Sequence, residues 1–240
     1  MVRLDSCDPV RVSGRQVVPR RSTARAEGVA FHVMNRAVQN VTLFTASRDY
    51  ECFLRTLSAG RDRFGIDLFA FCAMPNHWHL VVRPHGPQEL PEFMRWTTQT
   101  HAQRWRLDTR TSGRGALYQG RYRWAPIQQD RHFLHVCRYV ERNPLRAALV
   151  GRAELWPWSS ASLRIGGICT GPRLADWPVL RPARWTELLN EPQAPSVLDE
   201  IRRCVKRNLP YGGDDWCVSA LQDLELTSRA RGRPERRLVG

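Results

Sequence analysis

The feature that most constrains the fold of this chain is an apolar stretch with one short polar insert, residues 69–82. It reads FAFCAMPNHWHLVV, so a strand meets a turn at Met74-Pro75-Asn76 and then resumes. Because side chains alternate between the two faces of a strand, His77 and His79 point to one face and Trp78 to the other. The stretch therefore predicts a buried strand that carries two imidazoles side by side.

Two imidazoles on an otherwise apolar strand suit a divalent cation, because neutral imidazole is a common metal ligand. The alternative is a pair of core histidines whose hydrogen bonds are satisfied within the protein. A metal site needs further ligands, so the rest of the chain has to separate these two interpretations.

The charge of the chain indicates the kind of partner it meets. Its 240 residues include 37 Lys and Arg against 23 Asp and Glu, a formal net charge of +14, and Lys206 is the single lysine. Arg binds phosphate through two parallel hydrogen bonds and stacks on bases. A GC-rich coding bias explains Arg in place of Lys but not the positive excess, so the composition favours a nucleic-acid partner.

The cysteines and the hydropathy exclude several classes of protein. The seven cysteines are scattered and form no C-x-x-C pair, which argues against a zinc ribbon and a disulfide framework. The basic N-terminus has no apolar signal-peptide core, and no apolar run is long enough to span a bilayer. We expect a soluble, cytoplasmic protein with no membrane partner, whose cysteines are small buried apolar residues.

Hydrophobic periodicity predicts alternating strands and helices up to about residue 165. Helices are expected from an N-cap at Ser47, over 89–107, and from an N-cap at Asp130 to a stop at Asn143-Pro144, because a residue before proline leaves the α region. Strands are expected over residues 29–35 and 66–73, and the second of these resumes at the two histidines after the turn. Residues 116–127 are expected to form a hairpin, or a strand bent at Gly120. The order predicts an α+β fold with helices on one face of an antiparallel sheet.

The chain divides into three parts by composition. Residues 1–28 form a basic arm, expected to be mobile, with a merely disordered leader as the alternative. Residues 29–165 hold the strands and helices. Residues 166–240 form a basic, partly helical extension, irregular over 166–182 and helical over 197–207.

The third predicted helix carries Tyr139, and Asn143 follows four residues later on the same helical face. A tyrosine beside a two-histidine metal half-site, with an amide oxygen one turn away, suits phosphoryl transfer. The metal would act as a Lewis acid on the phosphate, and Tyr139 would attack phosphorus and be held as a phosphotyrosine. A phenol of pKa about 10 is a weak nucleophile, and nearby positive charge favours its ionised form.

Each of these residues has a plainer interpretation. Tyr139 could be a half-buried packing residue, and an asparagine before proline is a common end to a helix. Tyr118 and Tyr122 are rival nucleophiles, although their strand context suits stacking or packing better. His132 and His135 could carry protons or bind the metal, with exposed helix histidines as the alternative.

The segment Met74-Pro-Asn-His-Trp-His-Leu-Val-Val82 resembles the HUH motif of the IS200-like tyrosine transposases. The resemblance extends to residues 31–36, 43–44, Asp49, 118–122, 138–147 and 158–160. Residues 210–213 and 231–234 resemble the C-terminal part of the branch known as REP-associated tyrosine transposases. In all, it covers about residues 29–235.

This resemblance implies a ferredoxin-like HUH endonuclease core in residues 29–165, and a Mg²⁺ or Mn²⁺ ion. It implies cleavage of single-stranded DNA at a REP-like hairpin and rejoining of the strands. By the same resemblance His77, His79 and Asn143 are metal ligands, and Tyr139 is the nucleophile that leaves a 5′-phosphotyrosine and a free 3′-OH. Insertion-sequence members often carry Gln where this chain has Asn143, and Asn is associated with the REP-associated branch.

The resemblance also implies how DNA is held. The basic arm and the C-terminal extension would hold the foot of the hairpin and the tetranucleotide beside it, and the expected protein is nucleoid-associated. A monomer with its tyrosine acting in cis is expected, and a dimer with exchanged tyrosine helices is the alternative. The arginines predicted to contact DNA are Arg36, Arg121, Arg123, Arg231 and Arg233.

Two other functions remain open at this point. The chain could be an inactive hairpin-DNA binder that regulates or protects repeats, or a metal nuclease that uses activated water, with Tyr139 only structural. A covalent protein–DNA adduct separates the second case from a tyrosine transposase, because attack by water leaves no adduct.

Overall fold

Four strands form one antiparallel sheet in the computed structural model, which describes residues 27–39, 41–86, 88–111, 115–167 and 171–224. The strands are β1 (Ala30–Arg36), β2 (Asp67–Met74), β3 (His77–Arg83) and β4 (Arg123–Ile127), in the order β2-β3-β1-β4. All neighbouring strands are antiparallel. β1 and β2 therefore run in the same direction with β3 between them, the split βαβ arrangement of a ferredoxin-like fold. The predicted α+β class is confirmed.

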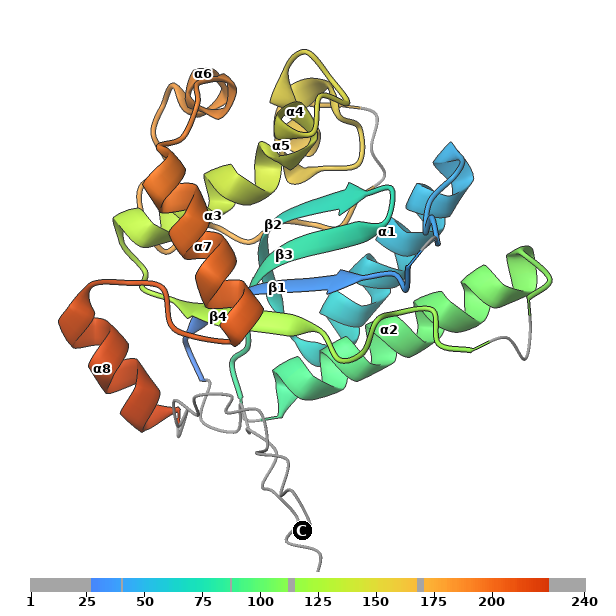
Figure 1. Ribbon diagram of the computed structural model, residues 1–240, viewed down its shortest axis with the longest axis horizontal. Helices are drawn as coiled ribbons and strands as arrows, with labels where there is room; N and C mark the ends of the chain where they lie inside the picture. Colours follow the sequence, from blue (N-terminus) through green and yellow to red (C-terminus); the bar gives the residue numbers. More distant parts are fainter. Residues whose placement is uncertain (1–26, 40, 87, 112–114, 168–170, 225–240) are drawn as a thin grey trace, which may run out of the picture.

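Two long helices, α1 (Ser47–Phe64) and α2 (Glu89–Asp108), cover one face of the sheet (Figure 1). Their buried aromatic residues pack on Trp78 and Leu80 of β3. Helix α1 ends at Gly65, whose φ of 63° is the left-handed conformation that closes many helices. The N-cap is Ala46 rather than the predicted Ser47, because the Asp49 carboxylate accepts hydrogen bonds from the backbone of Thr45 and Ala46.

The opposite face of the sheet is covered too, so the expectation of helices on one face only is wrong. Helices α3 (Arg131–Glu141) and α7 (Pro195–Arg207) pack there, together with the short α6 (Trp185–Asn190). Phe133 and Val140 of α3 join a buried cluster with Ala70 and Val81 of the sheet. The physical reason is that the strands are apolar on both faces, and each face needs a cover to keep water away.

The helix that carries Tyr139 begins and breaks where the sequence indicates. Its N-cap is Asp130, which accepts a hydrogen bond from the backbone N–H of His132 at 2.8 Å. Helix α3 ends at Glu141, and a short helix, α4 (Asn143–Arg146), starts at Asn143 with Pro144 in its first turn. The predicted break at Asn143-Pro144 is therefore present, although the chain continues as a further helical turn.

The segment before β4 differs from its prediction. Only residues 123–127 form a strand, whereas residues 116–122 make a single bridge, between Tyr118 and Ala37. Gly120, with φ of 151°, lies at the predicted bend. A strand or hairpin over the whole of 116–127 is therefore wrong, because its first half has only that one bridge to a strand.

After α4 the described chain continues through five more elements: η1 (Ala153–Leu155), α5 (Ser160–Arg164), the helices α6 and α7, and α8 (Asp214–Asp223). Described residues 171–184 form no helix or strand, as predicted, and the predicted helix over 197–207 corresponds to α7. Within the described part of the chain, no helix is both long and apolar enough to cross a bilayer. The division of the chain at residues 28 and 165 stays a prediction.

A buried carboxylate fixes helix α3 to the later part of the chain. Glu141 has no exposed surface. Its Oε1 accepts hydrogen bonds from Ser160 Oγ at 2.5 Å and Arg164 Nε at 3.1 Å, and its Oε2 accepts one from Trp185 Nε1 at 2.7 Å. Because these donors come from α5 and α6, the helix that carries Tyr139 is held against its own chain at its C-terminal end.

Candidate functional site

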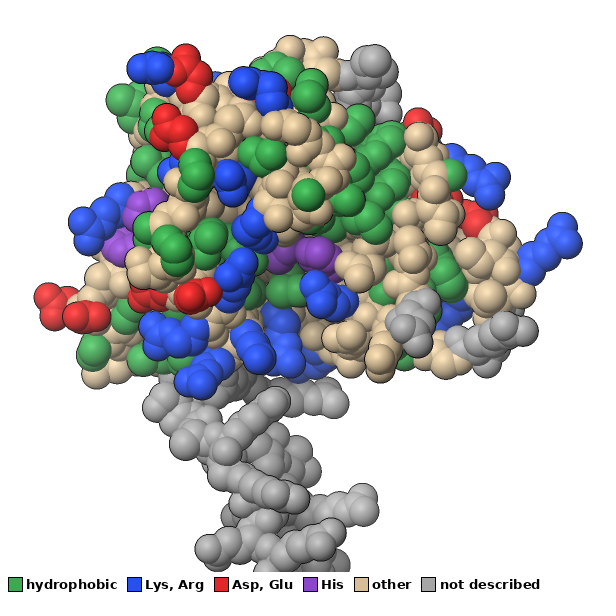
Figure 2. All heavy atoms as spheres, turned by 45° about the horizontal axis from the view of Figure 1, so that its top comes forward, with side chains coloured by type: hydrophobic (Ala, Val, Ile, Leu, Met, Phe, Trp, Pro, Cys, Tyr) green, Lys and Arg blue, Asp and Glu red, His purple; other side chains and the backbone are tan. Residues whose placement is uncertain are grey.

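A cleft of about 770 Å³ lies where β1 and β3 meet α3, α4 and α7. Figure 2 shows histidine side chains in a hollow on this face, with Lys and Arg side chains around it. Among the described residues, no Asp or Glu lines the cleft. Its cationic residues are Arg36, Arg121, Arg123, Arg146, Arg202 and Lys206. A cleft lined by one sign of charge concentrates ions of the opposite sign, which here are anions such as phosphates.

His77 and His79 lie side by side in this cleft, as strand alternation predicts, with ring centroids 5.1 Å apart. The Nδ1 atom of His77 is 2.8 Å from Asn76 Oδ1. An amide oxygen only accepts hydrogen bonds, so Nδ1 carries the proton and Nε2 keeps a free lone pair. Asn76, the residue before His77, therefore orients that imidazole for a ligand, a role that sequence reasoning missed.

A third histidine, His32 of β1, supports His79 from behind. Its Nε2 atom is 2.9 Å from His79 Nδ1, and both side chains are buried. When His79 Nδ1 donates this hydrogen bond, the Nε2 lone pair of His79 is free for a ligand. The proton of His32 is then on its Nδ1 atom, which has no partner in the described structure. Alternation along β1 puts His32 on the face opposite to Phe31 and Val33, but its contact with His79 depends on how β1 pairs with β3, which alternation alone does not predict.

The three imidazoles lie in a setting that disfavours their charged form. Burial lowers the pKa of His32 to about 3 and the pKa of His77 to about 4, and nearby arginines add to both shifts. Burial and then the neighbouring His32 lower the pKa of His79 well below its usual value. All three are therefore neutral near pH 7, the form in which imidazole binds a metal.

Tyr139 of α3 reaches the histidines of its own chain. Its side chain is 5% exposed, and its ring centroid lies 5.7 Å from those of both His32 and His79, in edge-to-face geometry. The side chain of Asn143 lines the same cleft. The structure therefore brings together the four residues that the sequence singled out, His77, His79, Tyr139 and Asn143. His32, which the sequence analysis did not single out, contacts His79 and Tyr139.

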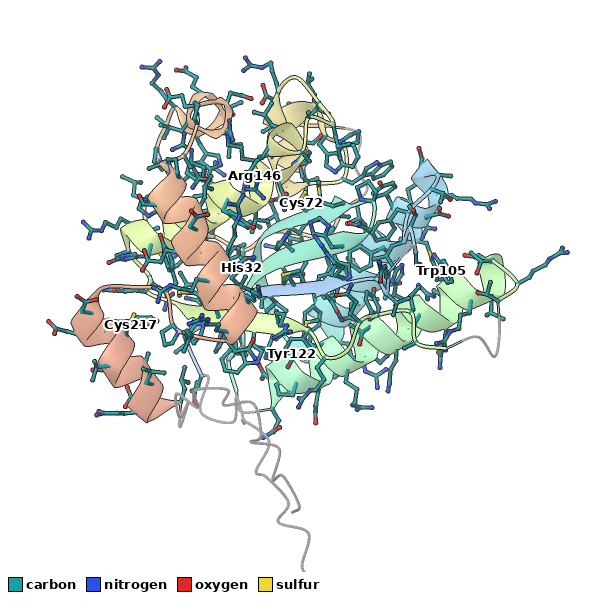
Figure 3. The ribbon with its side chains drawn as sticks, viewed as in Figure 1. His32, Cys72, Trp105, Tyr122, Arg146 and Cys217 are labelled. Carbon is teal, nitrogen blue, oxygen red and sulfur yellow. The ribbon has the colours of Figure 1, made fainter. Side chains whose placement is uncertain are left out.

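Arg146 of α4 connects the tyrosine to the asparagine. Its guanidinium carbon lies 4.3 Å from the centre of the Tyr139 ring, and its Nη2 donates to Asn143 Oδ1 at 2.8 Å. Figure 3 labels Arg146 together with His32 of β1 and Tyr122, which precedes β4. Arg146 belongs to a segment that the sequence analysis quoted without giving it a role, because its contacts follow from the break between α3 and α4.

The donor atoms in the cleft fit a divalent cation. The described residues contain no cluster of three His, Cys, Asp or Glu that could hold a metal. A cation here would therefore use His77, His79 and the amide oxygen of Asn143, and oxygens of a bound phosphate would complete its shell. The buried Nδ2 of Asn143 has no partner in the described structure, and because its N–H groups only donate, it fits an acceptor such as a phosphate oxygen bound beside the cation.

The rival residues lie in different surroundings. The Tyr118 hydroxyl, on the α1 and α2 side of the sheet, is hydrogen-bonded to Trp78 Nε1 at 3.1 Å and His101 Nδ1 at 2.6 Å. His132 and His135 are not in the cleft, and they pair with Asp130 and Tyr211. Tyr122 does line the cleft, where burial raises its pKa to about 12.

Arginines predicted to contact DNA are divided between the cleft and the undescribed tail. Arg36, Arg121 and Arg123 line the cleft, whereas Arg231 and Arg233 lie outside the described residues. Sequence reasoning missed Arg202 and Lys206, which also line it. Their spacing of four residues in a predicted helix placed both on one face, but nothing local indicated that this face turns toward the histidines.

Comparisons with known proteins give one family and one fold. Residues 26–143 match the family model described as "Transposase IS200 like". A solved structure of a REP-associated tyrosine transposase bound to a REP hairpin matches with a TM-score of 0.51 at 15% identity, covering 67% of this chain and 94% of that one. At that identity the likeness shows a shared fold. No curated protein matches the sequence.

Proposed function

Because residues 26–143 match the IS200-like transposase family, we propose that the chain cleaves and rejoins single-stranded DNA beside a hairpin. The observation that carries this proposal is the contact of the Tyr139 ring with His79, in a cleft whose described lining includes cations and no carboxylate. The fold shared with a transposase bound to a REP hairpin supports hairpin DNA, of the REP-like kind, as the substrate.

In the proposed reaction the Tyr139 oxygen attacks the scissile phosphorus, and the bond from phosphorus to the 3′ oxygen breaks. The phenol loses its proton to solvent, and the departing 3′ oxygen takes one up. The products are a 5′-phosphotyrosine and a free 3′-OH, so one phosphodiester is exchanged for another. A 3′-OH can then attack the phosphotyrosine and restore both a DNA phosphodiester and the phenol, with no external source of energy.

The other residues of the cleft would position and polarise the phosphate. His77, His79 and Asn143 would hold a divalent cation, Mg²⁺ or Mn²⁺, whose contribution when bound is Lewis-acid polarisation of the phosphate. His32 and Asn76 keep the two ligand imidazoles in the required tautomers. Arg146 lies over the Tyr139 ring, where its guanidinium would help to bind the phosphate that is attacked.

The alternatives explain less of this arrangement. An inactive hairpin binder needs the cationic cleft but gains nothing from a tyrosine in contact with a neutral histidine pair. A nuclease that uses activated water needs the histidines but not Tyr139. The contact between Tyr139 and His79 therefore favours the covalent mechanism over both.

The experiment mixes the protein with end-labelled single-stranded DNA that contains a REP-like hairpin, adds Mn²⁺, and separates the products on a denaturing gel. We expect a slowly migrating protein–DNA adduct in the wild type. Tyr139→Phe should lose the adduct and the cleavage, by at least about 10³-fold in rate, and keep its affinity for the hairpin. Tyr122→Phe is the matched control, because Tyr122 lines the same cleft, and it should form the adduct.

Other outcomes would replace the proposal. Cleavage without an adduct would mean that water attacks the phosphorus. Binding of the hairpin with neither cleavage nor adduct would favour the inactive binder. Adduct formation at the wild-type rate in Tyr139→Phe would move the nucleophile to another residue.

Oligomeric state forms part of the same proposal. The cleft takes its tyrosine and its histidines from one chain, which supports a monomer that acts in cis. Light scattering after size-exclusion chromatography should give the mass of one chain, with and without hairpin DNA. A dimer would favour the exchanged-helix alternative.

A further inference from the structure

Two cysteines on consecutive helices, Cys204 of α7 and Cys217 of α8, direct their sulfur atoms at one backbone oxygen. The Sγ atom of Cys204 lies 3.2 Å from the carbonyl oxygen of Pro210, and the Sγ atom of Cys217 lies 3.8 Å from that same oxygen. Both cysteines are free. Sulfurs that share an acceptor in this way are at most roughly 7 Å apart, and side-chain rotation brings such a pair toward the about 2.0 Å of a disulfide.

The loop between the two helices is fixed on the sheet, which keeps the two sulfurs together. The backbone N–H of Tyr211 donates to the carbonyl oxygen of Pro126 in β4 at 2.9 Å. The backbone N–H of Gly213 donates to Gln128 Oε1 at 2.7 Å. The carbonyl of Pro210, just before these anchored residues, therefore has a defined position between the end of α7 and the start of α8.

The two thiols differ in their access to solvent. Cys217 is half-buried (labelled in Figure 3), whereas Cys204 is only 2% exposed. Burial raises the pKa of Cys204 to about 11, and burial raises the pKa of Cys217 above its usual value as well. Both groups are therefore thiols near pH 7, and a reagent that comes from solvent meets Cys217 first.

A bond between these sulfurs would join a loosely packed helix to a wall of the cleft. Arg202, Val205 and Lys206 of α7 line the cleft of the candidate site. Cys204 belongs to the same helix. Within the described part of the chain, Ala220 is the one buried residue of α8, so few contacts hold that helix in place. A covalent link to α7 would therefore restrict α8 more than its packing does.

We propose that peroxides oxidise Cys204 and Cys217 to a disulfide, and that this bond fixes α8 to the cleft-lining helix α7. The sulfur of Cys217 attacks one oxygen of hydrogen peroxide and the O–O bond breaks, which leaves a sulfenic acid and one water. The sulfur of Cys204 then attacks the sulfur of Cys217, the S–O bond breaks, and the hydroxyl leaves with the proton of Cys204 as a second water. The two thiols together lose two electrons, and the peroxide gains them.

The oxidation involves no DNA, so its test is separate from that of the proposed function. Folded full-length protein is treated with excess hydrogen peroxide at about pH 8, where more of each thiol is ionised. Remaining thiols are blocked with iodoacetamide, and tryptic peptides are mapped without reduction. Because trypsin cuts after Lys and Arg, the disulfide joins peptide 204–206 to peptide 208–229. We expect this linked pair in at least roughly half of the molecules, and dithiothreitol should release it.

Three variants test the pairing and the order of the two steps. Cys52→Ser removes another half-buried cysteine, on α1, and should give the same linked pair as the wild type. Cys204→Ser removes the second thiol, so the sulfenic acid of Cys217 should react with dimedone at least about tenfold more than in the wild type. Cys217→Ser should leave the buried Cys204 unlinked and unlabelled. Thermal unfolding shows whether each variant is folded, and the peptide map of the wild type needs no variant.

Hydrogen–deuterium exchange tests the effect of the bond on α8. We expect amide exchange in residues 214–223 to slow by at least about threefold in the oxidised protein and to recover after reduction. A bond that forms without slowing this exchange would overturn the claim that it fixes α8.

Other outcomes would overturn the disulfide itself. Dimedone labelling of both cysteines without any linked peptide would show that the two sulfurs do not meet. Linkage of Cys217 to Cys52 or to a second chain would show a different pairing. A linked peptide that forms only in urea would belong to the unfolded chain rather than to the fold.

Discussion

Two neighbouring residues of β3, Trp78 and His79, face opposite sides of the sheet and meet opposite conditions. On one side Trp78 is fully buried, and it donates to Tyr118, whose hydroxyl also pairs with His101. On the other side His79 is also buried, and it pairs with His32. The Nδ1 atom of His32 has no hydrogen-bond partner in the described structure. The hydrogen bonds around Trp78 are therefore satisfied within the protein and those around His79 are not, although Thr97 Oγ1 of α2 also lacks a partner in the described structure.

The difference separates stability from function. A buried polar atom without a partner costs on the order of 1–3 kcal/mol, and native proteins keep such atoms where a ligand can complete them. The α1 and α2 face contains the aromatic cluster of Phe44, Phe53 and Trp78 and supplies stability. The histidine face brings imidazole, phenol and amide groups together, and two of the buried atoms there, His32 Nδ1 and Asn143 Nδ2, have no partner in the described structure.

The largest effect on stability is expected on the sheet face covered by α1 and α2, called the closed face below. Trp78→Ala should lower the free energy of unfolding by about 4 kcal/mol, because it removes a fully buried indole and leaves a cavity. Chemical denaturation followed by circular dichroism measures this loss. Trp216→Ala, a half-buried tryptophan of α8, should lose far less. Equal losses of unfolding free energy at Trp78 and Trp216 would contradict the view that the face under α1 and α2 supplies most of the stability.

A somewhat smaller loss is expected where helix α3 meets α5 and α6. Glu141→Gln should cost about 3 kcal/mol, because the buried Arg164 guanidinium loses its charged partner. Glu51→Gln, in an exposed pair with Arg55, should change stability by less than about 0.5 kcal/mol. The same denaturation curves test both variants. A Glu141→Gln protein as stable as the wild type would show that this network does not hold α3.

The pH dependence of stability tests the closed face in another way. Burial lowers the pKa of His101 to about 4 from 6.5, so below pH 6.5 the unfolded chain binds a proton that the folded chain refuses. The contribution of His101 is thus complete above about pH 6.5 and is lost as the pH falls toward 4. Between pH 7.5 and 5 the loss is about 2 kcal/mol. His101→Gln keeps a hydrogen-bonding group and should reduce the acid sensitivity by that amount, measured by denaturation at each pH, and an unchanged pH profile would contradict the assignment.

The smallest effect on stability is expected on the opposite face of the sheet, which carries His77 and His79. His77→Ala should change the free energy of unfolding by less than about 1 kcal/mol, because the side chain is only partly buried and bonds the exposed Asn76. Affinity for Mn²⁺, measured by electron paramagnetic resonance on the DNA-bound protein, should fall at least about tenfold. A large loss of stability with unchanged Mn²⁺ affinity would mean that His77 is a core histidine, the alternative left open by the sequence.

What could be predicted from the sequence was local. Strand alternation puts His77 and His79 on one face because its period depends only on neighbouring residues. The cap at Asp130 and the break at Asn143-Pro144 also depend on a few adjacent residues. These signals were sufficient to predict the order of strands and helices along the chain and to select His77, His79, Tyr139 and Asn143, which the structure brings into one cleft.

What could not be predicted depends on contacts between distant parts of the chain. His32 meets His79 only because β1 pairs with β3 in one particular register, with His32 opposite Val81. Arg202 lines the cleft only because α7 crosses the sheet. The cover on both faces has the same origin, since helical periodicity predicts that α3 buries one side but not which face of the sheet receives it.

The hold of Glu141 on α5 and α6 has a consequence for how the protein behaves in a cell. Under the proposed function, Tyr139 acts beside the histidines of its own chain, so each molecule would carry a complete set of reacting groups. Dilution would not separate these groups, and the cleavage rate per molecule would be the same at low as at high protein concentration. A single chain bound to a hairpin would then start the proposed reaction without a second copy.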